Sequence, residues 1–207
     1  MGTDVIDGGA PRSRALARDT QRDRLLHGMA VTVSRRGYAA TPVAEVLRAA
    51  GVSRRTFYEQ FADKEDCFIA AYDAIVGVCT ERLIAAYHAG TTWEAGIALA
   101  YEALLGTLAS EPDFAHLGVV DVLAAGPRAL ARREATLRRL ARFIDFTRER
   151  AEAMTTPPTL VGQAIVGGIH ELIYSQLVQG RAAQLPELTD ELLHYTFMLL
   201  GVARPSA

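Results

Sequence analysis

The feature that most constrains the fold is a pair of short helices joined at one glycine, residues 41–61, TPVAEVLRAAGVSRRTFYEQF. Thr41 is expected to cap the first helix, because its hydroxyl can accept a free backbone N–H, and Pro42 suits the first helical position. Gly51 can adopt the left-handed conformation that ends a helix, and Ser53 is placed to cap the second helix. The stretch therefore predicts a tight helical hairpin.

The second helix of this hairpin has one apolar face and one polar, basic face. Phe57 and Phe61 lie four residues apart, so we expect them to be buried together. The side chains left to face outward are Arg54, Arg55, Thr56, Tyr58 and Gln60. An ordinary bundle hairpin is the alternative interpretation, but it has no need for such an outer face. The pattern favours a helix-turn-helix, whose second helix enters the major groove of DNA.

The segment GVSRRTFYEQFADKEDCF resembles the recognition segment of the TetR (tetracycline-repressor) family of bacterial regulators. The matching residues are Gly51, Val52, Ser53, Thr56, Phe57, Tyr58, Phe61, Lys64 and Glu65. Gln60 stands where the family often has His or an aromatic residue, and Arg55 where it often has a small one. Both departures concern the DNA sequence that is recognised rather than the family.

The resemblance implies a sequence-specific, dimeric transcriptional regulator, a repressor that a small-molecule effector releases from double-stranded operator DNA. No cofactor, metal or membrane is expected. Lys64 begins the next helix, where free backbone N–H groups favour a phosphate. The expected DNA-binding residues are Thr41, Ser53, Arg54, Arg55, Thr56, Tyr58, Gln60 and Lys64.

The charge distribution favours a polyanionic partner for the N-terminal part alone. The formal charge of the whole chain is −2. Residues 12–60 contain ten Arg and four acidic residues, a net of +6, whereas residues 61–207 contain 12 basic and 18 acidic residues, a net of −6. A basic block on an acidic body predicts that only the block meets nucleic acid.

Hydrophobic periodicity predicts an all-α fold with about nine helices. We expect a disordered, basic-ended tail (1–18), a helix-turn-helix DNA-binding domain (19–62) and a helical regulatory and dimerisation domain (63–207). A long helix over Asp63–His88 should link the two domains. Further helices are expected over residues 91–109, 112–124, 127 to about 151, 157 to about 180, and 187–202. The last two should form a two-fold dimer interface, using Gly162, Ala164, Gly167, Gly168, Leu192, Tyr195 and Leu199.

The body mixes apolar residues with a few aromatic and polar ones, as do both the pockets between bundle helices and ordinary cores. The resemblance implies a small-molecule site there without saying which residues line it. The candidates are Tyr101, Phe114, His116, Phe143, His170 and Tyr174.

No catalytic pattern is complete, so an enzyme is not expected. His170-Glu171 begins a zinc-protease helix motif, but Tyr174 stands where its second His is needed. Ser175 lies five residues from His170 on the same helix, and no Gly-x-Ser-x-Gly turn exists. A helical enzyme that uses the body pocket remains an alternative, to be revived by turnover of a bound ligand.

A second alternative is a DNA-binding regulator controlled by a protein partner or by oxidation of Cys67 and Cys79. These thiols are twelve residues apart, a rotation of about 120° along a helix, so buried inert thiols are the favoured interpretation. Two cysteines form no disulfide framework, which fits a reduced cytoplasm. No apolar run reaches membrane-spanning length, and the first residues lack the apolar core of a signal peptide.

Overall fold

The computed structural model describes residues 20–148 and 159–202. Within these ranges the chain forms nine α-helices and two 3-10 helices, with no strand. The expected all-α fold with about nine helices is confirmed. The predicted tail, residues 1–18, lies outside the described residues. No helix among those described is long and apolar enough to cross a bilayer.

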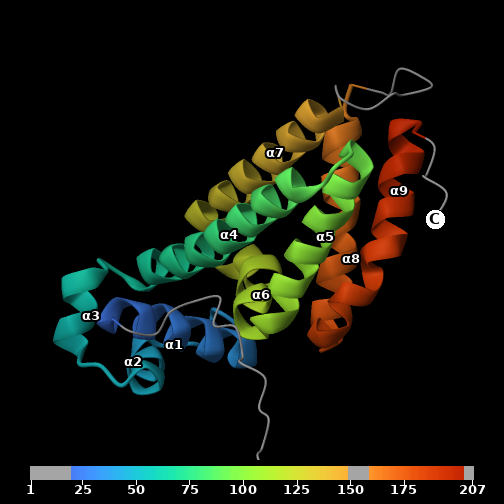
Figure 1. Cartoon of the computed structure of the whole chain (residues 1–207). Coiled ribbons are helices and arrows are strands. Elements are labelled where there is room, and N and C mark those ends of the chain that lie inside the picture. Colours follow the sequence, from blue (N-terminus) through green and yellow to red (C-terminus); the bar gives the residue numbers. More distant parts are fainter. Residues whose placement is uncertain (1–19, 149–158, 203–207) are drawn as a thin grey trace, which may run out of the picture.

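The helices divide between a small N-terminal group and a larger body (Figure 1). α1, α2 and α3 gather at one end, and α4 runs from that end along the body beside α7, while α9 lies beside both α5 and α8. Their bounds are α1 Gln21–Arg36, α2 Val43–Ala50, α3 Arg54–Gln60, α4 Lys64–Ala89, α5 Trp93–Ser110, α6 Pro112–Val119, η1 Asp121–Ala124, α7 Pro127–Arg148, α8 Val161–Val178, η2 Ala182–Leu188 and α9 Thr189–Leu200.

The predicted hairpin is present. Gly51 has φ 64° and ends α2 in the left-handed conformation, and Ser53 Oγ accepts the Thr56 N–H at 3.1 Å to begin α3. Phe57 is fully buried and Phe61 is 5 % exposed, with their ring centroids 5.6 Å apart. Turn chemistry and apolar spacing therefore determine this unit locally.

The expected cap at Thr41 is wrong. Pro42 is the N-cap residue of α2, without a side-chain cap hydrogen bond. The Thr41 hydroxyl is fully buried and donates to the Gly37 carbonyl at 2.9 Å. A hydroxyl buried in the core needs a hydrogen-bond partner, and the Gly37 carbonyl provides one. The Thr41 hydroxyl therefore closes the turn between α1 and α2.

Three expected helix boundaries also differ. The helix expected over residues 112–124 stops at Val119 and continues as the 3-10 helix η1. The last helix begins at Thr189, after a 3-10 helix that contains Pro186, because proline lacks the N–H that an α-helix needs. The cap of α5 is Thr92 rather than Thr91. The start expected for the next helix, at residues 157–158, lies outside the described residues. Among the described residues, α8 begins at Val161.

Candidate functional site

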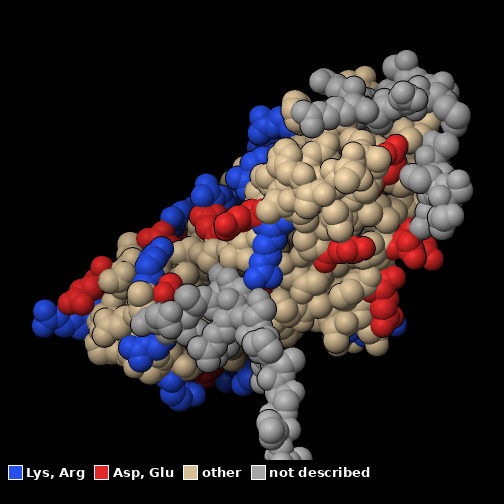
Figure 2. Space-filling model, in the orientation of Figure 1, with Lys and Arg blue, Asp and Glu red and all other residues tan. Residues whose placement is uncertain are grey.

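The outward face of α3 is the candidate DNA-binding surface. Arg54, Arg55, Tyr58 and Gln60 are exposed, and Figure 2 shows Lys and Arg side chains over the α1–α3 end of the molecule. Arg55 Nε donates to Glu59 at 2.8 Å, but the Arg55 side chain is 90 % exposed, so this pair is weak and leaves the guanidinium accessible. Arg54 is absent from the ion pairs among the described residues. It is therefore the arginine of α3 most available to a base edge.

Two further predicted DNA contacts, Ser53 and Thr56, serve first to begin α3. Ser53 Oγ and Thr56 Oγ1 lie 2.9 Å apart, and the same Ser53 oxygen caps the helix. Ser53 is exposed and Thr56 is half-buried. Their hydroxyls stay at the helix end that faces outward, so a contact with a DNA phosphate remains a prediction.

Thr41 and Lys64 lie behind this surface rather than on it. Because Thr41 is fully buried, the expectation that its side chain contacts DNA is not supported. Lys64 Nζ donates to the carbonyls of Tyr38 at 2.9 Å and Thr41 at 3.0 Å, and it lies 3.9 Å from the centroid of the Tyr38 ring. Burial lowers the pKa of this ammonium. Lys64 thus ties the start of α4 to the turn before α2, and its contact with a phosphate stays a prediction.

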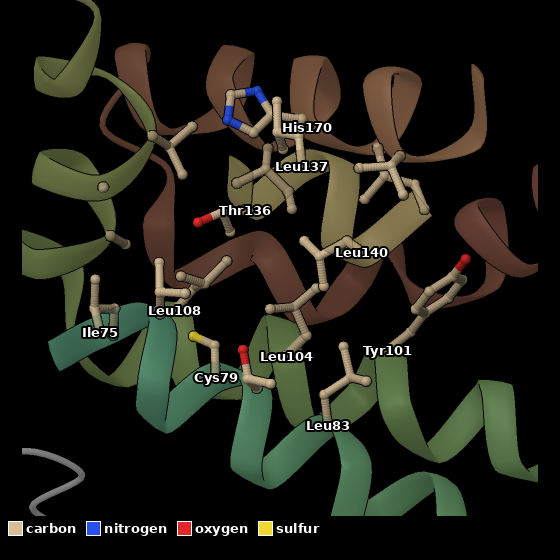
Figure 3. Close-up of a pocket in the computed structure, with 18 of the residues that line it drawn as sticks. Ile75, Cys79, Leu83, Tyr101, Leu104, Leu108, Thr136, Leu137, Leu140 and His170 are labelled. Atoms are coloured by element: carbon tan, nitrogen blue, oxygen red, sulfur yellow. The ribbon is translucent and has the colours of Figure 1, made fainter. Parts of the chain in front are cut away.

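A cavity of about 130 Å³ lies in the body between α4, α5, α6, α7 and α8. Figure 3 shows side chains from these helices converging on it. An apolar cavity of about 150 Å³ is enough for a benzene-sized group, so this space suits a small apolar ligand or part of a larger one. The aliphatic residues that line it include Ile75, Leu83, Leu104, Leu108, Leu137 and Leu140.

Four of the six predicted ligand-binding residues line this cavity, namely Tyr101, Phe114, Phe143 and His170. The other two do not. His116 Nδ1 is 2.7 Å from Asp121 Oδ2, so it fastens η1 to α6, and Tyr174 packs against the core. Sequence reasoning missed the aliphatic lining, because leucines facing a cavity have the same helical spacing as leucines in a filled core.

The polar residues in the cavity lining are Tyr72, Thr80, Tyr101, Thr136 and His170, and Figure 3 shows Tyr101 apart from Thr136 and His170. The Tyr101 hydroxyl is 2.7 Å from Thr196 Oγ1, and burial raises the pKa of Tyr101 to about 12. Burial, and then the neighbouring Arg133, lower the pKa of His170 to about 4, so its imidazole is neutral at physiological pH.

The two cysteines show no sign of redox reactivity. Cys67 is fully buried and Cys79 is 8 % exposed. Burial raises the pKa of each thiol to about 12, so neither is a thiolate near neutral pH, and the thiolate is the reactive form. The geometry therefore gives no support to control by cysteine oxidation.

No assembled catalytic group is found in the part of the chain that the structure describes. Ser175 Oγ accepts a hydrogen bond from Gln179 Nε2 at 3.0 Å, whereas His170 faces Arg133 on α7. No group of three or more His, Cys, Asp or Glu in these ranges is placed to hold a metal ion. The described geometry thus offers a binding cavity without a nucleophile and base in contact.

Two helices connect the cavity to the DNA-binding group. α4 contributes Cys79 and Leu83 to the cavity wall, and its first turns carry Lys64 and the buried Phe68. α6 contributes Phe114 to the same wall.

The outer side of α6 meets α1. The ring centroid of Phe114 lies 6.0 Å from that of His27, and Ser34 Oγ donates to Asp113 Oδ1 at 2.5 Å. A shift of the cavity wall therefore has two direct routes to α1–α3, of which the sequence had indicated only α4.

The fold and the site together define a class: a helix-turn-helix DNA-binding unit attached to a helical body that encloses an apolar cavity. Residues 26–71 match the model described as "Bacterial regulatory proteins, tetR family". The match covers the N-terminal DNA-binding unit, and over that unit the expected resemblance to the TetR family of bacterial regulators is confirmed.

Solved structures show the same fold over most of the chain. The fatty acid degradation regulator FadR from Bacillus halodurans is 18 % identical with a TM-score of 0.78, over 88 % of this chain and 97 % of that one. The transcriptional regulator FadR from Bacillus subtilis, in complex with stearoyl-CoA, is 17 % identical with a TM-score of 0.73, over 87 % and 98 %. The reduced form of NemR from E. coli is 16 % identical with a TM-score of 0.66, over 90 % and 100 %. No curated protein sequence matches.

Proposed function

We propose that this protein is a transcriptional repressor, without enzymatic activity, that an apolar small molecule releases from operator DNA in the bacterial cytoplasm. The observation that carries the proposal is the placement of α4 and α6, each of which lines the apolar cavity and also contacts the DNA-binding group. The B. subtilis neighbour in complex with stearoyl-CoA supports an apolar effector, because an acyl chain matches the aliphatic lining.

The test is to select bound duplexes from a random DNA pool and then titrate acyl compounds against the selected complex. We expect a specific site to emerge, and a saturating effector to weaken its binding by about 5- to 150-fold, the usual range of allosteric coupling. Leu104→Trp, which fills the cavity, should keep DNA binding and lose the response. A protein that selects no DNA sequence, or a bound effector that never changes DNA affinity, would contradict the proposal.

We propose a dimer through α8 and α9 that uses only part of the expected set of residues. Leu192 is fully buried, and a side chain at Gly168 would collide with Tyr195 of the same chain. These residues therefore pack within the monomer. The outer face still offers two exposed residues. One is Gly167, where an added Cβ would meet no atom within 4 Å, and the other is Met198, which is 61 % exposed.

Gly167→Arg is expected to convert the dimer to a monomer, because a charged side chain would stand where two subunits meet. The substitution costs the monomer nothing, since a Cβ there meets no atom within 4 Å and Arg favours helix more than Gly does. Sedimentation at micromolar concentration measures the change. Gly77→Arg, at an equally open position on α4, is the control and should stay dimeric. Two variants that sediment alike would contradict this interface.

A further inference from the structure

Arg133 of α7 is a half-buried cation whose Nε is buried, and the DNA-binding role leaves it unexplained. Its Nη2 lies 3.3 Å from His170 Nδ1, while its Nε is buried without a hydrogen-bond partner among the described residues. The ion pairs within those residues do not include Arg133. A buried polar atom without a partner costs free energy, so a guanidinium in this state points to an anion that it can bind.

The neighbours of Arg133 line the cavity, and Arg133 itself lies behind His170, outside the lining residues. His170, Tyr72 and Thr136 all line the cavity. Burial raises the pKa of the Tyr72 phenol, whereas Thr136 and the charge of Arg133 lower it. Most of the remaining lining is apolar. The cavity thus has a largely apolar lining and a positive charge beside its His170 end.

His170 suits this end because it adds no competing charge. Its pKa of about 4 keeps the imidazole neutral, and the unprotonated Nδ1 can accept one N–H of Arg133. The other donors of the planar guanidinium keep a fork that matches the two oxygens of a carboxylate or phosphate. The imidazole therefore orients Arg133 while leaving its Nε available.

We propose that the effector is an amphipathic molecule, an apolar chain that ends in an anionic group, and that Arg133 binds this group at the His170 end of the cavity. This inference rests on the proposed function and adds the chemical class of the effector. Tyr72 and Leu83 line the same wall eleven residues apart on α4, which corresponds to roughly 16 Å of helix. An extended acyl chain can lie along that wall, with part of it in the cavity of about 130 Å³. The anion is either the carboxylate of a free fatty acid or a phosphate of its coenzyme A ester.

The test compares three head groups on the same acyl or alkyl chain. The neutral fluorophore N-phenyl-1-naphthylamine reports occupation of the cavity, and dodecanol, dodecanoate and dodecanoyl-CoA compete with it. We expect at least one anionic competitor to bind about tenfold more tightly than dodecanol, which corresponds to about 1.4 kcal/mol. Equal affinity for all three would overturn the anion site while leaving the cavity in place. Failure of the fluorophore and of every competitor to bind would instead count against the proposed effector cavity itself.

Arg133→Met keeps the length of the side chain and removes its charge. We expect the advantage of the anionic competitor to disappear and the affinity for dodecanol to stay unchanged. If only dodecanoate loses affinity in this variant, Arg133 binds the carboxylate. If only dodecanoyl-CoA loses affinity, Arg133 binds a phosphate. Arg138→Met is the matched control, because Arg138 lies on the same helix and pairs with Glu134 on the exposed face. If Arg133→Met and Arg138→Met bind all three compounds alike, Arg133 is not the anion site.

Should Arg133→Met unfold, as thermal denaturation would reveal, Arg133→Lys provides the same test. A lysine retains the positive charge but lacks the planar fork. We expect it to retain part of the preference for an anion over dodecanol. An Arg133→Lys variant with the full bidentate preference, or a wild-type protein without any preference, would contradict the role assigned to the guanidinium.

Discussion

Arg54→Ala is expected to weaken binding to the selected operator and to remove its preference at one or two base pairs of each half-site. Arg54 lies in the first turn of α3, is exposed and has no ion-pair partner among the described residues. An arginine that donates two hydrogen bonds to guanine discriminates by about 1–3 kcal/mol, which is roughly 5- to 150-fold in affinity. The measurement is a titration, at fixed salt, against the operator and against single-base variants of it.

Tyr58→Phe provides the contrast, because it removes one hydroxyl from a residue that is 52 % exposed on the same helix. A tyrosine hydroxyl at this place is expected to contact a phosphate, which positions the protein without reading sequence. The variant should therefore weaken all DNA sites by a similar factor. If Arg54→Ala also weakens every site equally, Arg54 contacts the backbone rather than a base.

Asp113→Ala is expected to uncouple the effector from DNA without removing either binding activity. Asp113 accepts the Ser34 hydroxyl at 2.5 Å and so joins α6 to α1, next to Phe114 in the cavity wall. Without that bond, displacement of α6 by an effector is transmitted less directly to the DNA-binding group. A ligand can shift the two states only by the difference in its affinity for them, so the coupling should fall toward that carried by α4 alone.

Linkage makes this expectation quantitative. Operator DNA must weaken effector binding by the same factor by which the effector weakens DNA binding. Effector affinity is therefore measured with and without operator, for the wild type and for Asp113→Ala. Asp190→Ala, on the distant α9, is the control and should keep the full factor. If operator DNA does not change the effector affinity of the wild-type protein, this mechanism is excluded. If the coupling factor of Asp113→Ala equals that of the wild type, α4 alone carries the coupling.

Local sequence patterns were enough for the helix-turn-helix. A left-handed glycine at Gly51, a cap at Ser53 and two phenylalanines one turn apart act within a few residues, so their consequences follow without knowledge of the rest of the chain. The same holds for the outward face of α3, because burial of Phe57 determines which side chains must point away. The long α4 was predictable for a similar reason, its apolar spacing being sustained over many turns.

Tertiary packing decided the rest, because the relevant partners are distant in sequence. Thr41 looked like a helix cap, yet it is buried where α1 packs against α2, and its hydroxyl donates backward to the Gly37 carbonyl. Nothing local to Lys64 showed that its ammonium also donates to two carbonyls from the turn before α2. Whether an apolar face fills a core or lines a cavity depends on how well opposing helices close together, which no single helix encodes. For the same reason, only the approach of α7 to α8 brings Arg133 to His170.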